Sequence, residues 1–193
     1  MFRRLFIPTL VALGTALMVT SAFAQKFELT PGMQGELDRQ KTAIAGWAAS
    51  PTIVTAVLEQ NQRGPIPGMD NPKWKQTRRS DALVAAFQSN PAGQFLKSKV
   101  EDTKGANNEA FLSGSRGEKV AFVEKTTSYI HVGQAKFDVP FSTGKAWQGQ
   151  PEFDESSQTY AVQISVPVLS DGRPIGVLVV GVNLTHLQGL AKK

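Results

Sequence analysis

The sequence contains no cysteine among its 193 residues. Disulfides, thiol nucleophiles and thiolate metal ligands are therefore excluded, and the core alone must hold the fold. Histidine occurs only twice, as His131 and His186, without the spacing of a zinc-protease motif. A nucleophile-elbow motif and a phosphate-binding glycine loop are also lacking. We therefore expect a protein that is not an enzyme and that needs no metal or cofactor.

Long apolar runs are lacking after the first 24 residues. At the start, two arginines precede the apolar stretch Leu5–Val19, and Ala22-Phe23-Ala24 supplies the small residues of a cleavage site. This order predicts a signal peptide of residues 1–24, cleaved after Ala24, and a periplasmic location for residues 25–193. The alternative is an uncleaved anchor helix, because the apolar stretch is marginally long enough to span a membrane.

A large excess of charge of either sign is also lacking. The formal charge of +5 falls to +3 when the two arginines of the signal peptide are removed. A mild positive charge attracts anionic solutes but does not indicate a nucleic-acid partner. The basic segment Lys73–Arg79 carries one tryptophan, and we interpret it as a solvated helix start rather than a membrane or nucleic-acid patch.

Residues 25–103 have a helical pattern. Apolar residues spaced by three and four predict a helix that runs to about Gln62, and Ser50-Pro51 either kinks it or restarts a second helix. Three cap-like dipeptides mark helix starts: Thr30-Pro31, Ser80-Asp81 and Asn90-Pro91.

Residues 104–187 have a strand pattern. The candidate strands are Ala110–Leu112, Lys119–Glu124, Ser128–Val132, Tyr160–Leu169 and Pro174–Leu184. Asp171-Gly172 predicts a tight hairpin turn between the last two. The last strand is apolar on both faces, so we expect it at the centre of the sheet. Helices first and strands second favour an α+β domain.

Several segments resemble the single Cache domain, a PAS-like (PDC-type) extracytoplasmic sensor family. They are Asn108–Leu112, Gly117–Ala121, Lys125–Tyr129, Gly133–Phe137, Phe153–Ser156, Gln163–Val168, Ile175-Gly176 and Gly181–Leu184. The likeness covers about residues 105–187. It implies one domain, with a long N-terminal helix and helical linker packed on an antiparallel PAS-like sheet. Ser128, Ile130 and His131 depart from the residues usual in the family, and the amino-acid-binding constellation of double Cache domains is absent.

The resemblance implies a periplasmic protein that binds a small molecule and has no output module of its own. It would signal through a membrane partner such as a sensor kinase or chemoreceptor. A homodimer formed through the N-terminal helix is a further expectation. The alternatives are a solute-binding or envelope structural module without signalling, and an enzyme of unrecognised type.

In PAS-like sheets the ligand lies on one face of the sheet, beneath the loops that cross it. The candidate ligand-binding residues are Lys125, Thr126, Ser128, Tyr129, Lys136, Trp147, Asp154, Gln163 and Ser165. Lysines, hydroxyls and an aromatic wall suit a small polar, preferably anionic, metabolite.

Each candidate also has a structural interpretation. Thr126 and Ser128 could cap a turn, and Tyr129 could belong to the core. Trp147 could cover the pocket or the edge of the sheet. We expect Lys136 to be a solvated surface charge and His131 to be a surface residue of a strand, unless they contact the ligand. Asp154 could instead accept hydrogen bonds from backbone amides of its own loop.

Overall fold

The computed structural model describes residues 27–154 and 158–190, so the predicted signal peptide lies outside the described residues. Two helices open this part, α1 (Pro31–Ala48) and α2 (Pro51–Arg63). The predicted long helix is thus two helices. Pro51 has no backbone N–H to donate to the carbonyl four residues earlier, so a continuous helix would lose a hydrogen bond there. The Thr30 side chain caps α1 by accepting from the Met33 amide at 3.3 Å, as its position predicted.

The other elements follow in an order that agrees with an α+β domain. The helices are α3 (Asn71–Gln76), α4 (Ala82–Ser89), α5 (Pro91–Asp102), α6 (Ala135–Thr143) and α7 (Leu184–Leu190). The strands are β1 (Asn107–Ser113), β2 (Lys119–Phe122), β3 (Trp147–Gln148), β4 (Glu152–Asp154), β5 (Thr159–Ser170) and β6 (Arg173–Asn183). None of the helices in the described ranges is both long enough and apolar enough to cross a membrane.

The strands form one antiparallel sheet in the order β2-β1-β6-β5-β3, and β4 also pairs with β5. The apolar strand β6 lies at the centre, as predicted. Asp171 and Gly172 have φ angles of 49° and 74°. Both central residues of the β5–β6 turn are therefore left-handed, the geometry that matches the twist of a tight hairpin.

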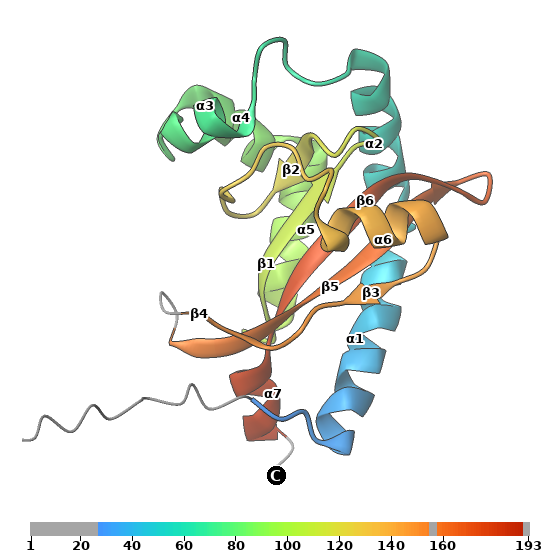
Figure 1. The fold of residues 1–193 in the computed structure, drawn as a ribbon, viewed down its shortest axis with the longest axis vertical. Helices are drawn as coiled ribbons and strands as arrows, with labels where there is room; N and C mark the ends of the chain where they lie inside the picture. Colours follow the sequence, from blue (N-terminus) through green and yellow to red (C-terminus); the bar gives the residue numbers. More distant parts are fainter. Residues whose placement is uncertain (1–26, 155–157, 191–193) are drawn as a thin grey trace, which may run out of the picture.

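Alternation along the strands gives the sheet two apolar faces. One face packs against α1, α2 and α5, with Leu112, Ile164 and Val180 among its fully buried residues. The other carries Phe111 and Val179 and packs against α6. Figure 1 shows α6 lying across β5 and β6.

Two predictions about the segment after β2 were wrong or incomplete. Ser128–Val132 is not a strand, and its only ladder contact is an isolated bridge between Glu118 and Ile130. The Asn71 side chain accepts from the Tyr129 and Ile130 amides at 2.8 Å and donates to the Ile130 carbonyl. The Tyr129 carbonyl and the His131 amide still bond to the backbone of Lys119 and Gly117. The Asn71 side chain satisfies the other backbone groups, where a second strand partner would have bonded. Helix α6 was not predicted.

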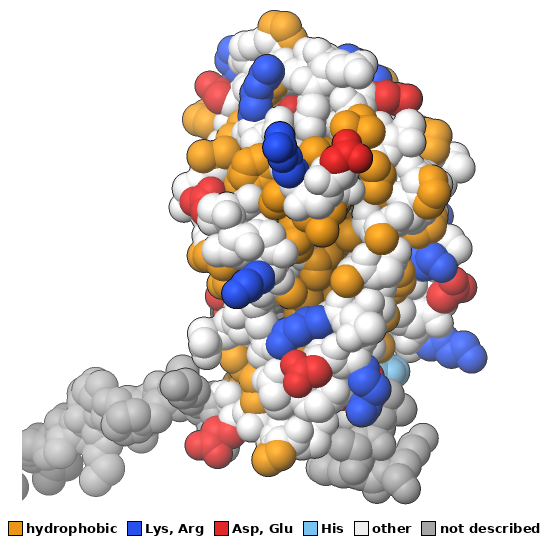
Figure 2. All heavy atoms as spheres, turned by 90° about the vertical axis from the view of Figure 1, so that its right-hand side faces the viewer, with side chains coloured by type: hydrophobic (Ala, Val, Ile, Leu, Met, Phe, Trp, Pro, Cys, Tyr) orange, Lys and Arg blue, Asp and Glu red, His pale blue; other side chains and the backbone are white. Residues whose placement is uncertain are grey.

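Apolar side chains gather in a hollow on the side of the molecule where α1 and the end of α6 lie (Figure 2). A cavity of about 310 Å³ between α1, Ala146 and β5 is lined by Ala45, Ala49, Gly144, Ala146, Val166, Pro167 and Leu169. Leu169 is 44% exposed.

Close approach of β6 to its neighbours requires glycine at 176. A Cβ atom there would lie 2.4 Å from the Ser113 carbonyl oxygen and 2.8 Å from Val57. We predict that Gly176→Ala lowers the free energy of unfolding by about 2–3 kcal/mol, through overpacking. Urea denaturation would measure it.

Gly35→Ala is the control, because nothing lies within 4 Å of a Cβ at this position in α1. It should raise stability by up to about 1 kcal/mol, the propensity gain within a helix. Equal effects of the two substitutions would contradict the close strand contact.

Candidate functional site

The candidate site lies on the face of the sheet that packs against α6. A cavity of about 500 Å³ opens between this face, the loop after β2 and the start of α6. Its lining residues are Arg79, Asn108, Glu109, Phe111, Glu124, Lys125, Thr126, Thr127, Ser128, His131, Lys136 and Gln163. Because Arg79, Lys125 and Lys136 contribute three cations, we name it the basic cavity.

The loop after β2 is fixed by helix α3. The Trp74 indole nitrogen donates to the Thr126 carbonyl at 2.8 Å, and the Thr126 hydroxyl donates to the Ser128 carbonyl at 3.0 Å. The Lys125 ammonium lies 4.7 Å from the centre of a Trp74 ring, a cation–π contact. Partial burial, and then the charge of Arg79, lower the pKa of Lys125. Buried Trp74 thereby sets where one cation of the cavity lies.

A polar chain crosses the floor of the cavity. The Lys136 ammonium, at the start of α6, donates to the side-chain amide oxygen Oε1 of Gln163 at 3.1 Å. The amide nitrogen of Gln163 donates to a Glu109 carboxylate oxygen at 3.2 Å. Glutamine on β5 thus joins a cation from α6 to an anion from β1.

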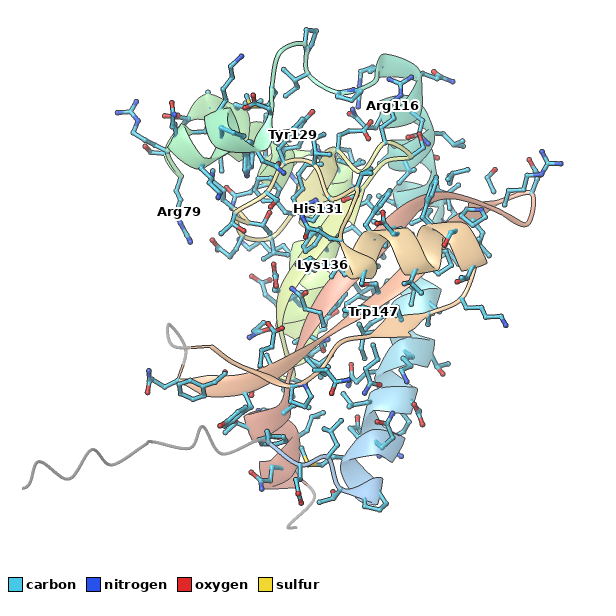
Figure 3. The ribbon with its side chains drawn as sticks, viewed as in Figure 1. Arg79, Arg116, Tyr129, His131, Lys136 and Trp147 are labelled. Atoms are coloured by element: carbon cyan, nitrogen blue, oxygen red, sulfur yellow. The ribbon has the colours of Figure 1, made fainter. Side chains whose placement is uncertain are left out.

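Arg79 belongs to the turn between α3 and α4 and reaches the cavity from the far rim. It donates to Glu124 at 3.3 Å, and both side chains are mostly exposed. Exposed pairs of this kind contribute little to stability. Figure 3 shows Arg79 pointing down from the α3–α4 side, while His131, Lys136 and Trp147 follow one another along the sheet.

His131 corrects an expectation, because it is buried rather than a surface residue of a strand. Its ring packs against the Phe111 ring at a tilt of 32°, with centroids 4.7 Å apart. Burial, followed by the charges of Lys119 and Lys136, lowers the pKa of His131 to about 2. The imidazole is therefore neutral at physiological pH. Its Nδ1 has no hydrogen-bond partner in the described part of the chain.

Lys119 is a buried charge-bearing residue that sequence reasoning missed. It is fully buried on β2, with its amine 3.2 Å from the Phe111 ring centre and no hydrogen-bond partner among the described residues. Burial holds its pKa well below the usual range, although the charge of Glu109 opposes this. The inward position could have been suspected, because the residues that follow Lys119 in the predicted strand, Val120 to Val123, are apolar on both faces.

A second cavity of about 510 Å³ adjoins the basic one on the same face. Its lining residues are Asn108, Glu109, Trp147, Gly149, Gln150, Glu152, Phe153, Ala161, Gln163 and Gly181. Because its charged residues are two glutamates, we name it the acidic cavity. Asn108, Glu109 and Gln163 line both cavities.

The candidates named from the sequence fall into groups. Five line the basic cavity: Lys125, Thr126, Ser128, Lys136 and Gln163. Trp147 lines the acidic cavity. The side chain of Asp154 lies outside the described residues.

Tyr129 and Ser165 lie elsewhere. The Tyr129 ring packs against Trp74 in the core, and its hydroxyl accepts from the Ile66 amide at 2.9 Å. Ser165 is buried opposite Trp147 in the β3–β5 ladder, and its hydroxyl has no partner among the described residues. Tyr129 thus takes the core role that was the alternative for it.

No protein-family model matches the chain, and no curated protein is significantly similar to it. Solved structures do match. The V. cholerae histidine kinase DctB sensor domain is 16% identical, with a TM-score of 0.42. The ligand-binding domain of the Pseudomonas fluorescens chemoreceptor CtaA, in complex with L-leucine, is 12% identical with a TM-score of 0.46. The sensory domain of the Campylobacter jejuni chemoreceptor Tlp3, with isoleucine bound, is 14% identical with a TM-score of 0.42.

The three matches cover 81%, 81% and 86% of this chain. The chain in turn spans 59%, 53% and 69% of theirs, so it corresponds to little more than half of the first two. All three are sensory or ligand-binding domains of a histidine kinase or of chemoreceptors. Similarity this distant carries no ligand and no partner over to the chain.

Lys119 gives a prediction for stability. A lysine with a lowered pKa binds its proton in the unfolded chain but not in the folded one, so stability is lost as pH falls below the unfolded pKa of about 10.4. Lys119→Met should therefore raise the free energy of unfolding at pH 7, by about 2 kcal/mol. The gain should shrink as pH approaches 10.

Denaturant titrations at pH 7 and pH 9.5 would measure both effects. Exposed Lys145, substituted by Met, is the control and should change stability by less than about 0.5 kcal/mol. A Lys119→Met protein that is less stable than the original at both pH values would show that the amine is charged and held by Glu109.

Proposed function

We propose that the chain is a periplasmic sensor protein that binds a small anionic metabolite in the basic cavity. The observation that carries the proposal is the convergence of Arg79, Lys125 and Lys136 from three separate segments on one cavity. Of the two acids that line the cavity, Glu124 is paired with Arg79, and Glu109 accepts from Gln163. The lysines thus keep their charge available for a ligand.

The chemistry of the lining suits a carboxylate or phosphate. Lys125 and Lys136 offer charge-assisted hydrogen bonds, which are stronger than neutral ones. The Ser128 and Thr127 side chains add neutral partners, and Phe111 gives an apolar floor. A few polar groups around an apolar surface are typical of small-molecule sites.

Export through the predicted signal peptide would bring the protein to the periplasm, and the Cache resemblance points to signalling through a membrane-bound sensor kinase or chemoreceptor. A homodimer through α1 belongs to the same proposal, and the apolar hollow beside α1 supports it. A ligand can favour one conformation for such a partner only if it binds that conformation more tightly.

The second candidate is a solute-binding or envelope module that does not signal. The two differ in whether the ligand changes association with a membrane protein. Crosslinking in envelope extracts with and without ligand would separate them, since a pure solute carrier would show no ligand-dependent receptor or kinase partner.

Lys136 is the residue to test for binding. Removal of one charge-assisted hydrogen bond costs about 1.5–3 kcal/mol, so Lys136→Met should weaken binding of an anion about 10- to 100-fold. Calorimetry of the purified protein would measure this loss of affinity. The ligand would be the carboxylate or phosphate that raises the melting temperature most in a thermal-shift panel.

Lys145→Met is the matched control, because it removes the same charge at an exposed position outside the cavity. Its dissociation constant should stay within about twofold of the unsubstituted protein. Equal weakening by both substitutions would mean that the anion senses only net charge, and absence of binding across the panel would refute the proposed cavity.

A further inference from the structure

The two cavities on the α6 side of the sheet carry opposite charge. The basic cavity has three cations, one of which is paired with Glu124. Among the described residues that line the acidic cavity, Glu109 and Glu152 are the charged ones. Since the cavities share Asn108, Glu109 and Gln163, the change of sign occurs across a common wall.

The common wall is held by the Gln163 amide. Its oxygen accepts from Lys136 and its nitrogen donates to Glu109. A flipped amide would place donor against ammonium and acceptor against carboxylate, so this orientation is the one that both neighbours permit. The cation therefore stays on one side of Gln163 and the carboxylate on the other.

The acidic cavity also has aromatic walls. The Trp147 ring reaches over Gly149, where a Cβ atom would lie 3.1 Å from the ring. The Phe153 ring packs against the Tyr160 ring, with centroids 5.1 Å apart and planes inclined at 59°, and Phe153 is 46% exposed. Aromatic faces beside carboxylates attract organic cations, through the ring quadrupole and the opposite charge.

We infer that the acidic cavity binds an amine or quaternary ammonium group of the same ligand whose anionic group occupies the basic cavity. The inference rests on the proposed function and names its ligand class: compounds whose positive and negative charges are separated by a chain. The separation follows from Gln163, because the two charges must lie on opposite sides of its side chain.

A matched set of probes tests this. Acetate, butanoate and hexanoate carry the anion alone, hexylamine carries the cation alone, and glycine, 4-aminobutanoate and 6-aminohexanoate carry both at increasing separation. Calorimetry with the purified full chain should show at least one of the two longer amino acids binding about tenfold or more tighter than the monocarboxylate of equal length. Glycine should show no such gain over acetate.

Glu152→Gln tests the acidic cavity without changing the basic cavity. The substitution should remove most of the advantage of the amino acid and leave the affinity for the monocarboxylate within about twofold. Glu101→Gln, at an exposed position of α5, is the control and should preserve the advantage.

The outcomes distinguish the two proposals. Monocarboxylates that bind as tightly as every amino acid of the set, or a Glu152→Gln protein that keeps the full advantage, would overturn the second subsite and leave the anion cavity intact. If Lys136→Met weakens none of the probes, the proposed function fails, and the inference fails with it.

Discussion

The central strand β6 is apolar on both faces, so the sheet must be covered from two sides. Helices α1, α2 and α5 cover one face with a continuous core. The other face is covered by separate pieces: α3 and α4 contact the β2 side through Trp74 and Phe87, and α6 lies on β5 and β6. The two cavities lie on this second face, so the site is a consequence of how unequally the two faces are covered.

This unequal cover also explains where the unusual polar residues lie. Lys119, His131 and Ser165 are buried and lack partners for at least one side-chain atom among the described residues. Such groups reduce stability, and a compact core would exclude them. They lie on the face that carries the cavities, where Phe111 contacts both Lys119 and His131. These groups without partners therefore reduce stability on the face of the sheet that carries the cavities.

Local signals predicted most of the fold. Asp171-Gly172, the apolar strand after it and the dipeptides Thr30-Pro31 and Asn90-Pro91 each act within a few residues, and each lies where expected. Ser128–Val132 has a strand-like pattern, yet Asn71 satisfies its backbone from 58 and 59 residues away. Helix α6 contains Pro140 and only nine residues, so its sequence gave little periodicity to detect.

The site was less predictable than the fold, because tertiary contacts assemble it. Nothing in the sequence links Glu109 to Gln163, or Arg79 to the loop after β2. Once folded, β5 connects the two faces: Gln163 joins the cavities, while its neighbours Val162 and Ile164 lie in the core shared with α1. A tightly packed core transmits small displacements. We therefore expect a ligand that displaces Gln163 to displace the neighbouring contacts between β5 and α1, the helix through which we propose that the chain dimerises.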